Sequence, residues 1–155
     1  MKKNDRIYIA GHNGLVGSSV YKLLKKNGFK NIITVDRKDL DLKNFNKVDA
    51  YFKRKKIDYM IMAAAKAGGI IANSSNQKDF YLENIEIQNS LLKLALKKKI
   101  KRTIYLGTSC IYPKFAKVPI DEDSLLTGKL EKTNQCYAIA KIAGIKLCEA
   151  LFEDY

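Results

Sequence analysis

The chain has 155 residues, enough for one domain with a buried core, and 46% of them are apolar. That composition excludes a disordered chain, and no apolar stretch approaches the roughly 18 residues that a membrane-spanning helix needs. The net charge is +13, from 29 basic and 16 acidic residues. The basic runs 53–56 and 97–102 lack the interleaved aromatic side chains that stack on bases, so we expect solvated helix ends and no nucleic-acid partner.

The amino terminus is basic, but the apolar run after it, Ile7 to Ala10, is too short for a secretory signal. We therefore expect a cytoplasmic protein with no membrane partner. The three cysteines, Cys110, Cys136 and Cys148, show no metal-ligand spacing, and the chain has a single histidine. Neither a metal site nor a disulfide framework is expected.

The apolar pattern predicts strands that alternate with helices along the chain. The expected strands cover residues 6–10, 32–35, 59–64 and 103–106, with a possible short strand at 39–42. The expected helices cover residues 15–27, 45–55, 79–99 and 137–152. Gly28 should end the first helix and Asn44 should cap the second. Residues 66–78 and 114–133 are expected to be loops, because glycine, proline and small polar residues are frequent there.

Strands separated by helices imply right-handed crossovers and a parallel sheet covered on both faces. We therefore predict an α/β fold with a doubly wound parallel sheet in one domain over residues 1–155. Ligands of such sheets bind at the carboxyl ends of the strands. The segments that follow the expected strands should therefore line one crevice.

The turn after the first strand is rich in glycine. Gly11, Gly14 and Gly17 have the spacing G-x-x-G-x-x-G between a strand and a helix. The first glycine permits a tight turn, the second lets a diphosphate approach the backbone, and the third lets the helix pack closely. The helix N-terminus adds unpaired N–H groups and a partial positive charge. We expect a dinucleotide to bind this turn, which also contains His12, Asn13, Leu15 and Val16.

Asp36 ends the second expected strand, where an acidic side chain commonly accepts hydrogen bonds from the adenosine ribose. This favours NAD, because a carboxylate repels a 2′-phosphate. Arg37 follows directly and is able to pair with such a phosphate, which favours NADP. Asp36 and Arg37 together are therefore compatible with either NAD or NADP. The other residues expected to contact the cofactor are Asp41, Leu42, Ala63, Ala64, Ala65, Leu106, Gly107 and Lys141.

Tyr137 and Lys141 are four residues apart on an expected helix, so they share a face. A nearby ammonium lowers the pKa of a phenol and makes it an effective acid–base group. Thr108 would hydrogen-bond the same substrate oxygen, and Lys141 would also bind the nicotinamide ribose. A tyrosine and a lysine at this spacing are frequent by chance, so the pair gains meaning only beside the glycine turn and the 107–109 segment.

Cys110 is two residues beyond Thr108 and should face the same side of an extended segment. A thiolate there would be able to remove a proton alpha to a ketone. The residue is also compatible with a small apolar side chain at a strand end.

Four segments together resemble the extended short-chain dehydrogenase/reductase family. They are residues 9–17, 63–70, 106–114 and 137–149. The resemblance extends over essentially the whole chain. Within that family, Cys-Ile-Tyr-Pro at 110–113 and Tyr-Ala-Ile-Ala-Lys-Ile-Ala-Gly at 137–144 are similar to a branch that acts on GDP-linked 4-keto sugars.

The resemblance implies a GDP-sugar substrate, proton exchange at C3 and C5 of the 4-keto sugar, and reduction of C4 by NADPH. It implies that Cys110 is the epimerisation base and that Tyr137 and Lys141 are the proton donor and its partner. Thr108 stands where most members have serine, and Asn13 stands where some have an arginine near the 2′-phosphate. The resemblance also implies a homodimer formed through the helices at 79–99 and 137–152.

Family members are about twice this length and carry a C-terminal substrate domain. The resemblance therefore implies that residues 1–155 are an NAD(P)-binding domain with a Rossmann-type doubly wound parallel sheet, incomplete at the C-terminus, and we expect this N-terminal portion to be inactive alone. Two alternatives remain open. One is another NAD-dependent nucleotide-sugar 4-epimerase or dehydratase, of which a 4-epimerase would not need Cys110 as a base. The other is a non-catalytic dinucleotide-binding module, which would bind the cofactor without turnover.

Overall fold

A computed structural model describes residues 1–154. The helices and strands follow in the order β1 (Ile7–Ala10), α1 (Leu15–Lys26), β2 (Ile32–Ile33), α2 (Phe45–Phe52), β3 (Tyr59–Met62), α3 (Ile70–Ser75), α4 (Gln77–Lys97), β4 (Arg102–Tyr105) and α5 (Gln135–Asp154). Short 3-10 helices between β4 and α5 are η1 (Ser109–Ile111), η2 (Glu122–Ser124) and η3 (Lys132–Asn134). The chain divides into two compact units. The sheet unit contains residues 1–65 and 86–106, and the α5 unit contains residues 66–85 and the described chain from 107 onward.

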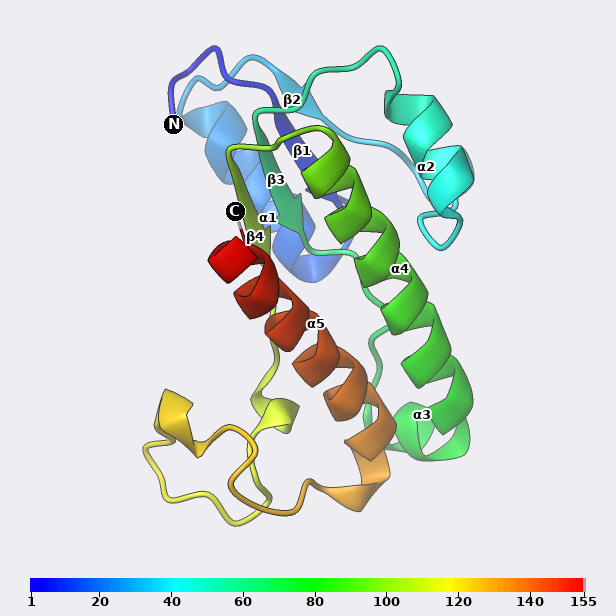
Figure 1. The fold of residues 1–155 in the computed structure, drawn as a ribbon, viewed down its shortest axis with the longest axis vertical. Helices are drawn as coiled ribbons and strands as arrows, with labels where there is room; N and C mark the ends of the chain where they lie inside the picture. Colours follow the sequence, from blue (N-terminus) through cyan, green and yellow to red (C-terminus); the bar gives the residue numbers. More distant parts are fainter. Residues whose placement is uncertain (155) are drawn as a thin grey trace. The chain divides into compact units, whose positions relative to one another are not determined.

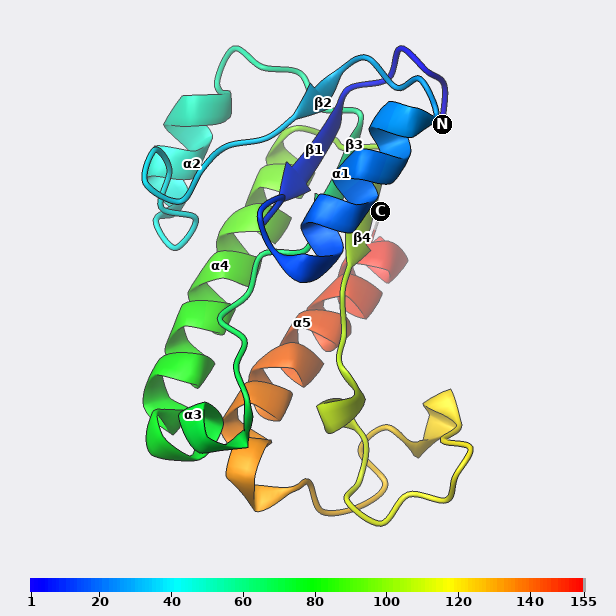
Figure 2. The ribbon, with the colours of Figure 1, turned by 180° about the vertical axis from the view of Figure 1, so that it is seen from behind.

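The sheet unit contains a four-stranded parallel sheet in the order β2-β1-β3-β4. In the register, Ile7 of β1 lies opposite Ile32 of β2 on one side and Tyr59 of β3 on the other. Figures 1 and 2 show α1 on one face of this sheet, and α2 with the C-terminal half of α4 on the opposite face. The predicted α/β class with a parallel sheet covered on both faces is confirmed.

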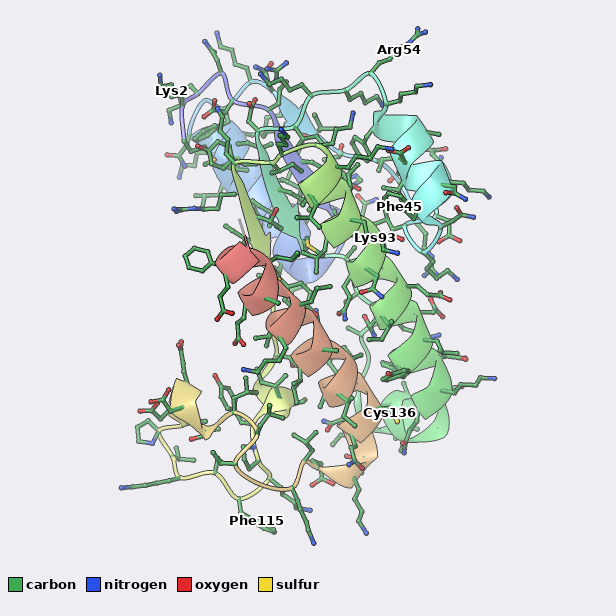
Figure 3. The ribbon with its side chains drawn as sticks, in the orientation of Figure 1. Lys2, Phe45, Arg54, Lys93, Phe115 and Cys136 are labelled. Carbon is green, nitrogen blue, oxygen red and sulfur yellow. The ribbon has the colours of Figure 1, made fainter. Side chains whose placement is uncertain are left out.

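Alternate residues of β1 pack into two apolar layers. Ile7 and Ile9 pack with Leu24 of α1. Tyr8 faces the other way, and its ring centroid lies 4.6 Å from that of Phe52 in α2. All four residues of β1 are buried, which explains why this strand is a continuous apolar run without a polar alternation. On the same face as Phe52, Lys93 of α4 lies with its Nζ 5.8 Å from the ring centroid of Phe45 (Figure 3).

Three element predictions differ from the structure. β2 has only two residues, and it pairs with β1 alone at the edge of the sheet. Residues 39–42 form no strand, because the Asp36 carbonyl accepts from the N–H groups of Asp39 and Leu40, both at 3.0 Å, and closes a turn. The 66–78 segment, predicted as a loop, contains α3 and the first residues of α4. In α3, the Asn73 amide donates to the Gly68 carbonyl at 2.7 Å, which stabilises the helical turn.

Both of the predicted helix-end signals are confirmed. Gly28 has a φ of +77° just past α1, a conformation that glycine adopts at little cost. The Asn44 side chain accepts from the Lys47 N–H at 3.1 Å and caps α2. Leu91, Leu92 and Leu94 of α4 are buried within the chain, so they do not present a surface to a second copy. In the part of the chain that the structure describes, no helix has the length and apolar character to cross a bilayer.

Candidate active site

The glycine turn lies against the end of β3. Gly11 has a φ of +83°, and a Cβ added to it would lie 2.6 Å from the Ala64 nitrogen. A Cβ on Gly17 would lie 2.1 Å from the Gly11 carbonyl oxygen. Side chains at these two positions would push apart the turn, the strand end and α1. The roles predicted for the first and third glycines therefore have a direct geometric basis.

The N-terminus of α1 is open. Gly14 is its N-cap residue, and the helix has neither a side-chain cap nor an acidic residue in its first turn. Leu15 is 88% exposed and Val16 is 47% exposed, so the first turn reaches the surface. Backbone N–H groups at such an end have no partner within the helix and carry partial positive charge. The arrangement suits an anionic group such as a diphosphate.

Asp36 is tied to the glycine turn. Its Oδ1 accepts from Nδ2 of Asn13 at 2.6 Å and lies 3.6 Å from Nε2 of His12. The Asp36 side chain remains 42% exposed. Arg37 next to it is exposed. Asp36 thus lies at the glycine turn with a neutral amide donor beside it, and its contact with an adenosine ribose stays a prediction.

The remaining predicted cofactor residues of the sheet unit lie at strand ends and in the following turns. Ala63, Ala64 and Ala65 are partly buried after β3, and Leu106 is partly buried after β4. Asp41 accepts from the Lys43 N–H at 3.1 Å, and Leu42 lies in the same turn. Asp41 also lines a cavity of about 470 Å³ with Lys43, Asn44, Phe45, Asn46 and Glu86.

Tyr137 is held in the first turn of α5 by two neighbours. The Thr108 hydroxyl donates a hydrogen bond to the phenol. The ring of Phe80 packs edge-on, with the ring centroids 6.1 Å apart. Burial raises the pKa of Tyr137, the charge of Cys110 raises it further, and the Thr108 hydrogen bond lowers it. The net direction is upward, opposite to the lowering that the ammonium alone would predict, because desolvation is the largest effect.

Lys141 lies one helical turn after Tyr137 and is only 4% exposed. Burial lowers the pKa of its ammonium to about 8. A surface lysine, the plain structural explanation of this residue, is therefore excluded. A buried amine that titrates close to neutral pH is typical of functional sites.

Cys110 lies in η1, so the extended segment assumed in the sequence argument is absent. The thiol nevertheless faces the first turn of α5. Its Sγ lies 3.0 Å from Nδ2 of Asn134, and its charge influences the Tyr137 phenol. Asn134 was not among the predicted site residues. Its position three residues before Tyr137, directly before the helix that carries the phenol, is the signal that would have found it.

The α5 unit thus brings together the predicted alcohol, phenol and thiol, with the predicted amine on the same helix. Gly107 precedes them, and a Cβ on it would meet Ile145 at 3.7 Å, an ordinary contact. The glycine turn and Asp36 belong to the sheet unit. That all these groups line one crevice stays a prediction. Among residues 1–154, no cluster of His, Cys, Asp or Glu has the arrangement of a metal site.

The fold and these two sets of residues define an α/β protein of the dinucleotide-dependent type. Residues 7–155 match the model of the NAD dependent epimerase/dehydratase family, and the chain belongs to that family. It is 47% identical over 150 residues to a putative GDP-L-fucose synthase 2 of Arabidopsis thaliana, and 43% identical over 151 residues to the GDP-L-fucose synthase of Escherichia coli K12. These matches cover 97% of the chain, but only 46% and 47% of the relatives. The chain therefore spans about half the length of the curated relatives that it matches.

A solved structure shares the whole architecture of the chain. It is a GDP-mannoheptose C4 reductase from Campylobacter jejuni with NADP bound, with a TM-score of 0.96 and 36% identity. The match covers 100% of this chain and 46% of the reductase.

Proposed function

We propose that residues 1–155 form the NAD(P)-binding region of a nucleotide-sugar epimerase/reductase. The proposed reaction converts GDP-4-keto-6-deoxy-D-mannose to GDP-L-fucose with NADPH. The observation that carries the proposal is that Thr108, Cys110 and Tyr137 bring two hydroxyl groups and a thiol together, with the buried residue Lys141 one helical turn further along α5. The names of the Arabidopsis and E. coli relatives support the substrate.

The glycine turn fits a dinucleotide, because Gly11 and Gly17 leave no room for side chains and the α1 N-terminus is uncapped. We propose that residues 11–17 hold the diphosphate and that Asp36 and Arg37 face the adenosine ribose. We propose NADP rather than NAD, since Arg37 supplies a cation for a 2′-phosphate and the solved reductase contains NADP. When bound, the cofactor supplies the hydride. Asp41, Leu42, Ala63, Ala64, Ala65, Leu106, Gly107 and Lys141 are the remaining proposed contacts.

The epimerisation needs a base for carbons alpha to the ketone. We assign this role to Cys110, whose thiolate takes a proton from C3 or C5 while the electron pair of the broken bond moves to the carbonyl oxygen. Tyr137 donates a hydrogen bond to that oxygen and stabilises the enolate, and Thr108 supports it by donating its single hydroxyl proton to the phenol. Inversion is completed when a general acid on the opposite face delivers a proton to the same carbon and the electron pair returns from the oxygen to that carbon.

The reduction needs an acid at the C4 oxygen. Tyr137 supplies this proton, and its raised pKa keeps the phenol protonated until the oxygen gains charge. Thr108 donates to the phenol oxygen and therefore favours the phenolate that remains after the transfer. Lys141, as an ammonium, stabilises the same phenolate electrostatically.

A C4 reductase without epimerase activity is the second candidate, because the Campylobacter reductase is similar over the whole chain. Cys110 distinguishes the two functions. An enzyme that only reduces needs Tyr137 and Thr108 but no base at position 110.

The test is an incubation with the 4-keto sugar nucleotide and NADPH in deuterated water, of the chain alone, which is expected to be inactive, and of the chain with a separately made C-terminal substrate domain. For the epimerase/reductase we expect deuterium at C3 and C5 and oxidation of NADPH. Cys110→Ser should lose deuterium uptake, and Tyr137→Phe should slow NADPH oxidation, each by about 10²–10⁴-fold. Cys136→Ser is the matched control, since it retains a donor to Gln77 (3.3 Å in the wild type) and should change neither rate. NADPH oxidation without deuterium uptake would favour the reductase, and cofactor binding with no reaction even after the substrate domain is added would favour a non-catalytic module.

The homodimer also belongs to this proposal. Among the large apolar side chains of α4, Tyr81, Leu82 and Leu96 are exposed, at 37%, 46% and 38%. We expect a dimer in light scattering, and Leu82→Glu should shift it toward monomer if this part of α4 lies in the interface.

A further inference from the structure

Asn134 stands at the position where asparagine ordinarily caps a helix, because it directly precedes α5. A capping asparagine accepts a backbone N–H with its side-chain oxygen. Here Oδ1 of Asn134 is buried and accepts no hydrogen bond from the described residues. The amide nitrogen lies 3.0 Å from Sγ of Cys110. Capping therefore does not explain this side chain, and its amide is directed at the sulfur.

Both partners of this contact are held by local structure. The Glu131 side chain accepts from the Thr133 N–H at 3.3 Å and pairs with Lys114 Nζ at 2.7 Å, which anchors η3. The Asn134 N–H closes that turn on the Glu131 carbonyl at 3.4 Å. Cys110 is held in η1, where the Ile111 N–H donates to the Thr108 carbonyl at 3.3 Å. The amide and the thiol are thus brought together by two short helical turns.

We propose that Asn134 is a positioning residue for Cys110: its amide N–H, 3.0 Å from Sγ, orients the sulfur toward the sugar and stabilises negative charge on it when it acts as a base. A hydrogen bond donated to an ionised group favours the ionised form. In the proton transfer, the thiolate takes the proton from the carbon alpha to the ketone and becomes a thiol, while the electron pair moves to the ketone oxygen. This use of Cys110 rests on the proposed function, but the effect of Asn134 on the sulfur does not.

The test measures the alkylation rate of Cys110 by iodoacetamide at one pH near neutrality. The background Cys136→Ser, Cys148→Ala leaves a single thiol. Asn134→Ala removes the donor and should slow alkylation about tenfold. Asn134→Asp keeps the shape but places a carboxylate beside the sulfur, and should slow it further. Gln135→Ala, at the exposed neighbouring position, is the matched control and should stay within about twofold of the background.

The sign of the change separates a positioning role from a merely structural one. Looser packing around η3 would expose the thiol and speed alkylation, whereas loss of the N–H donor slows it. Circular dichroism verifies that each variant is folded. If Asn134→Ala does not fold, the isosteric Asn134→Asp still tests the inference. Unchanged or faster alkylation in both variants would overturn the inference. Deuterium uptake into the sugar is measured separately with the substrate domain added, so its absence there in the unsubstituted chain would refute the proposed function and leave the alkylation result standing.

Discussion

At the scale of single residues, the proposed acid is a phenol whose surroundings favour its neutral form. Desolvation dominates over the Thr108 hydrogen bond at Tyr137, and the same desolvation lowers the pKa of Lys141. Both groups therefore tend toward their uncharged states. The sequence predicted the types of these residues and their helical spacing. It did not predict the pKa direction of Tyr137, because burial depends on segments such as Phe80 that are distant along the chain.

Lys141 should reduce the stability of the protein at neutral pH. Its pKa in the folded protein, about 8, is below the ordinary 10.5, so the unfolded chain binds more protons between these values and stability rises with pH there. Below pH 8, Lys141 is protonated in both the folded and the unfolded chain, and the desolvation of its ammonium lowers the free energy of unfolding by the full amount. Lys141→Met should raise the free energy of unfolding at pH 7 by up to about 3 kcal/mol. Urea unfolding at several pH values measures it, and the gap between variant and wild type should close toward pH 10. A difference in the free energy of unfolding that does not change with pH would show that the charge of Lys141 is not its cause.

At the scale of elements, the strand–turn–helix unit from β1 to α1 is specified by local sequence. The glycine spacing predicted a tight turn and a close helix, and the structure has both. Cys110 is a contrasting case. The sequence argument placed it correctly near Tyr137 but through an extended segment, whereas the chain turns into η1 there. Short 3-10 turns carry no strong periodic signal, so sequence alone did not reveal this one.

Gly17 should be the least replaceable glycine of this turn. Its added Cβ would lie 2.1 Å from a backbone oxygen, which no side-chain rearrangement relieves. Gly17→Ala should lower the free energy of unfolding by about 3 kcal/mol, as overpacking does. Gly14→Ala is the control, because its Cβ meets the same oxygen at 3.4 Å and should cost less than about 1 kcal/mol. Urea unfolding of both variants measures the two losses in the free energy of unfolding. Equal losses would show that the contact with the Gly11 carbonyl oxygen is not the cause.

At the scale of the whole chain, the amino ends of three strands of the sheet unit meet at one buried carboxylate. Asp58, just before β3, accepts from the backbone N–H of Arg6 at 2.9 Å and from its Nε at 3.1 Å. Lys101 Nζ, just before β4, lies 3.4 Å from the other oxygen. The backbone hydrogen bond from Arg6 is the largest of the effects that together lower the pKa of Asp58 to about 2. The basic residues of this edge therefore include structural partners of Asp58.

Asp58 should contribute stability that is present at neutral pH and lost in acid. Because its pKa is lowered from the ordinary 3.8 to about 2, the contribution is complete above pH 4 and disappears as the pH falls through 2. Asp58→Asn should lower the free energy of unfolding by about 2 kcal/mol at pH 7. Asp49→Asn, which removes an exposed pair with Lys97, should cost less than about 1 kcal/mol. Acid unfolding curves measure both, and an equal cost at pH 7 would refute the special role of Asp58.

The sequence by itself determined the α/β class, the glycine turn, the helix ends at Gly28 and Asn44, and the residue types of the candidate site. These features depend on patterns within about ten residues, such as apolar periodicity and capping. Only the tertiary structure decided that Lys141 is buried, that the pKa of Tyr137 is raised, and that Asn134 directs its amide to Cys110. Burial and hydrogen bonding of these groups arise where separate segments meet, and no local pattern encodes that meeting.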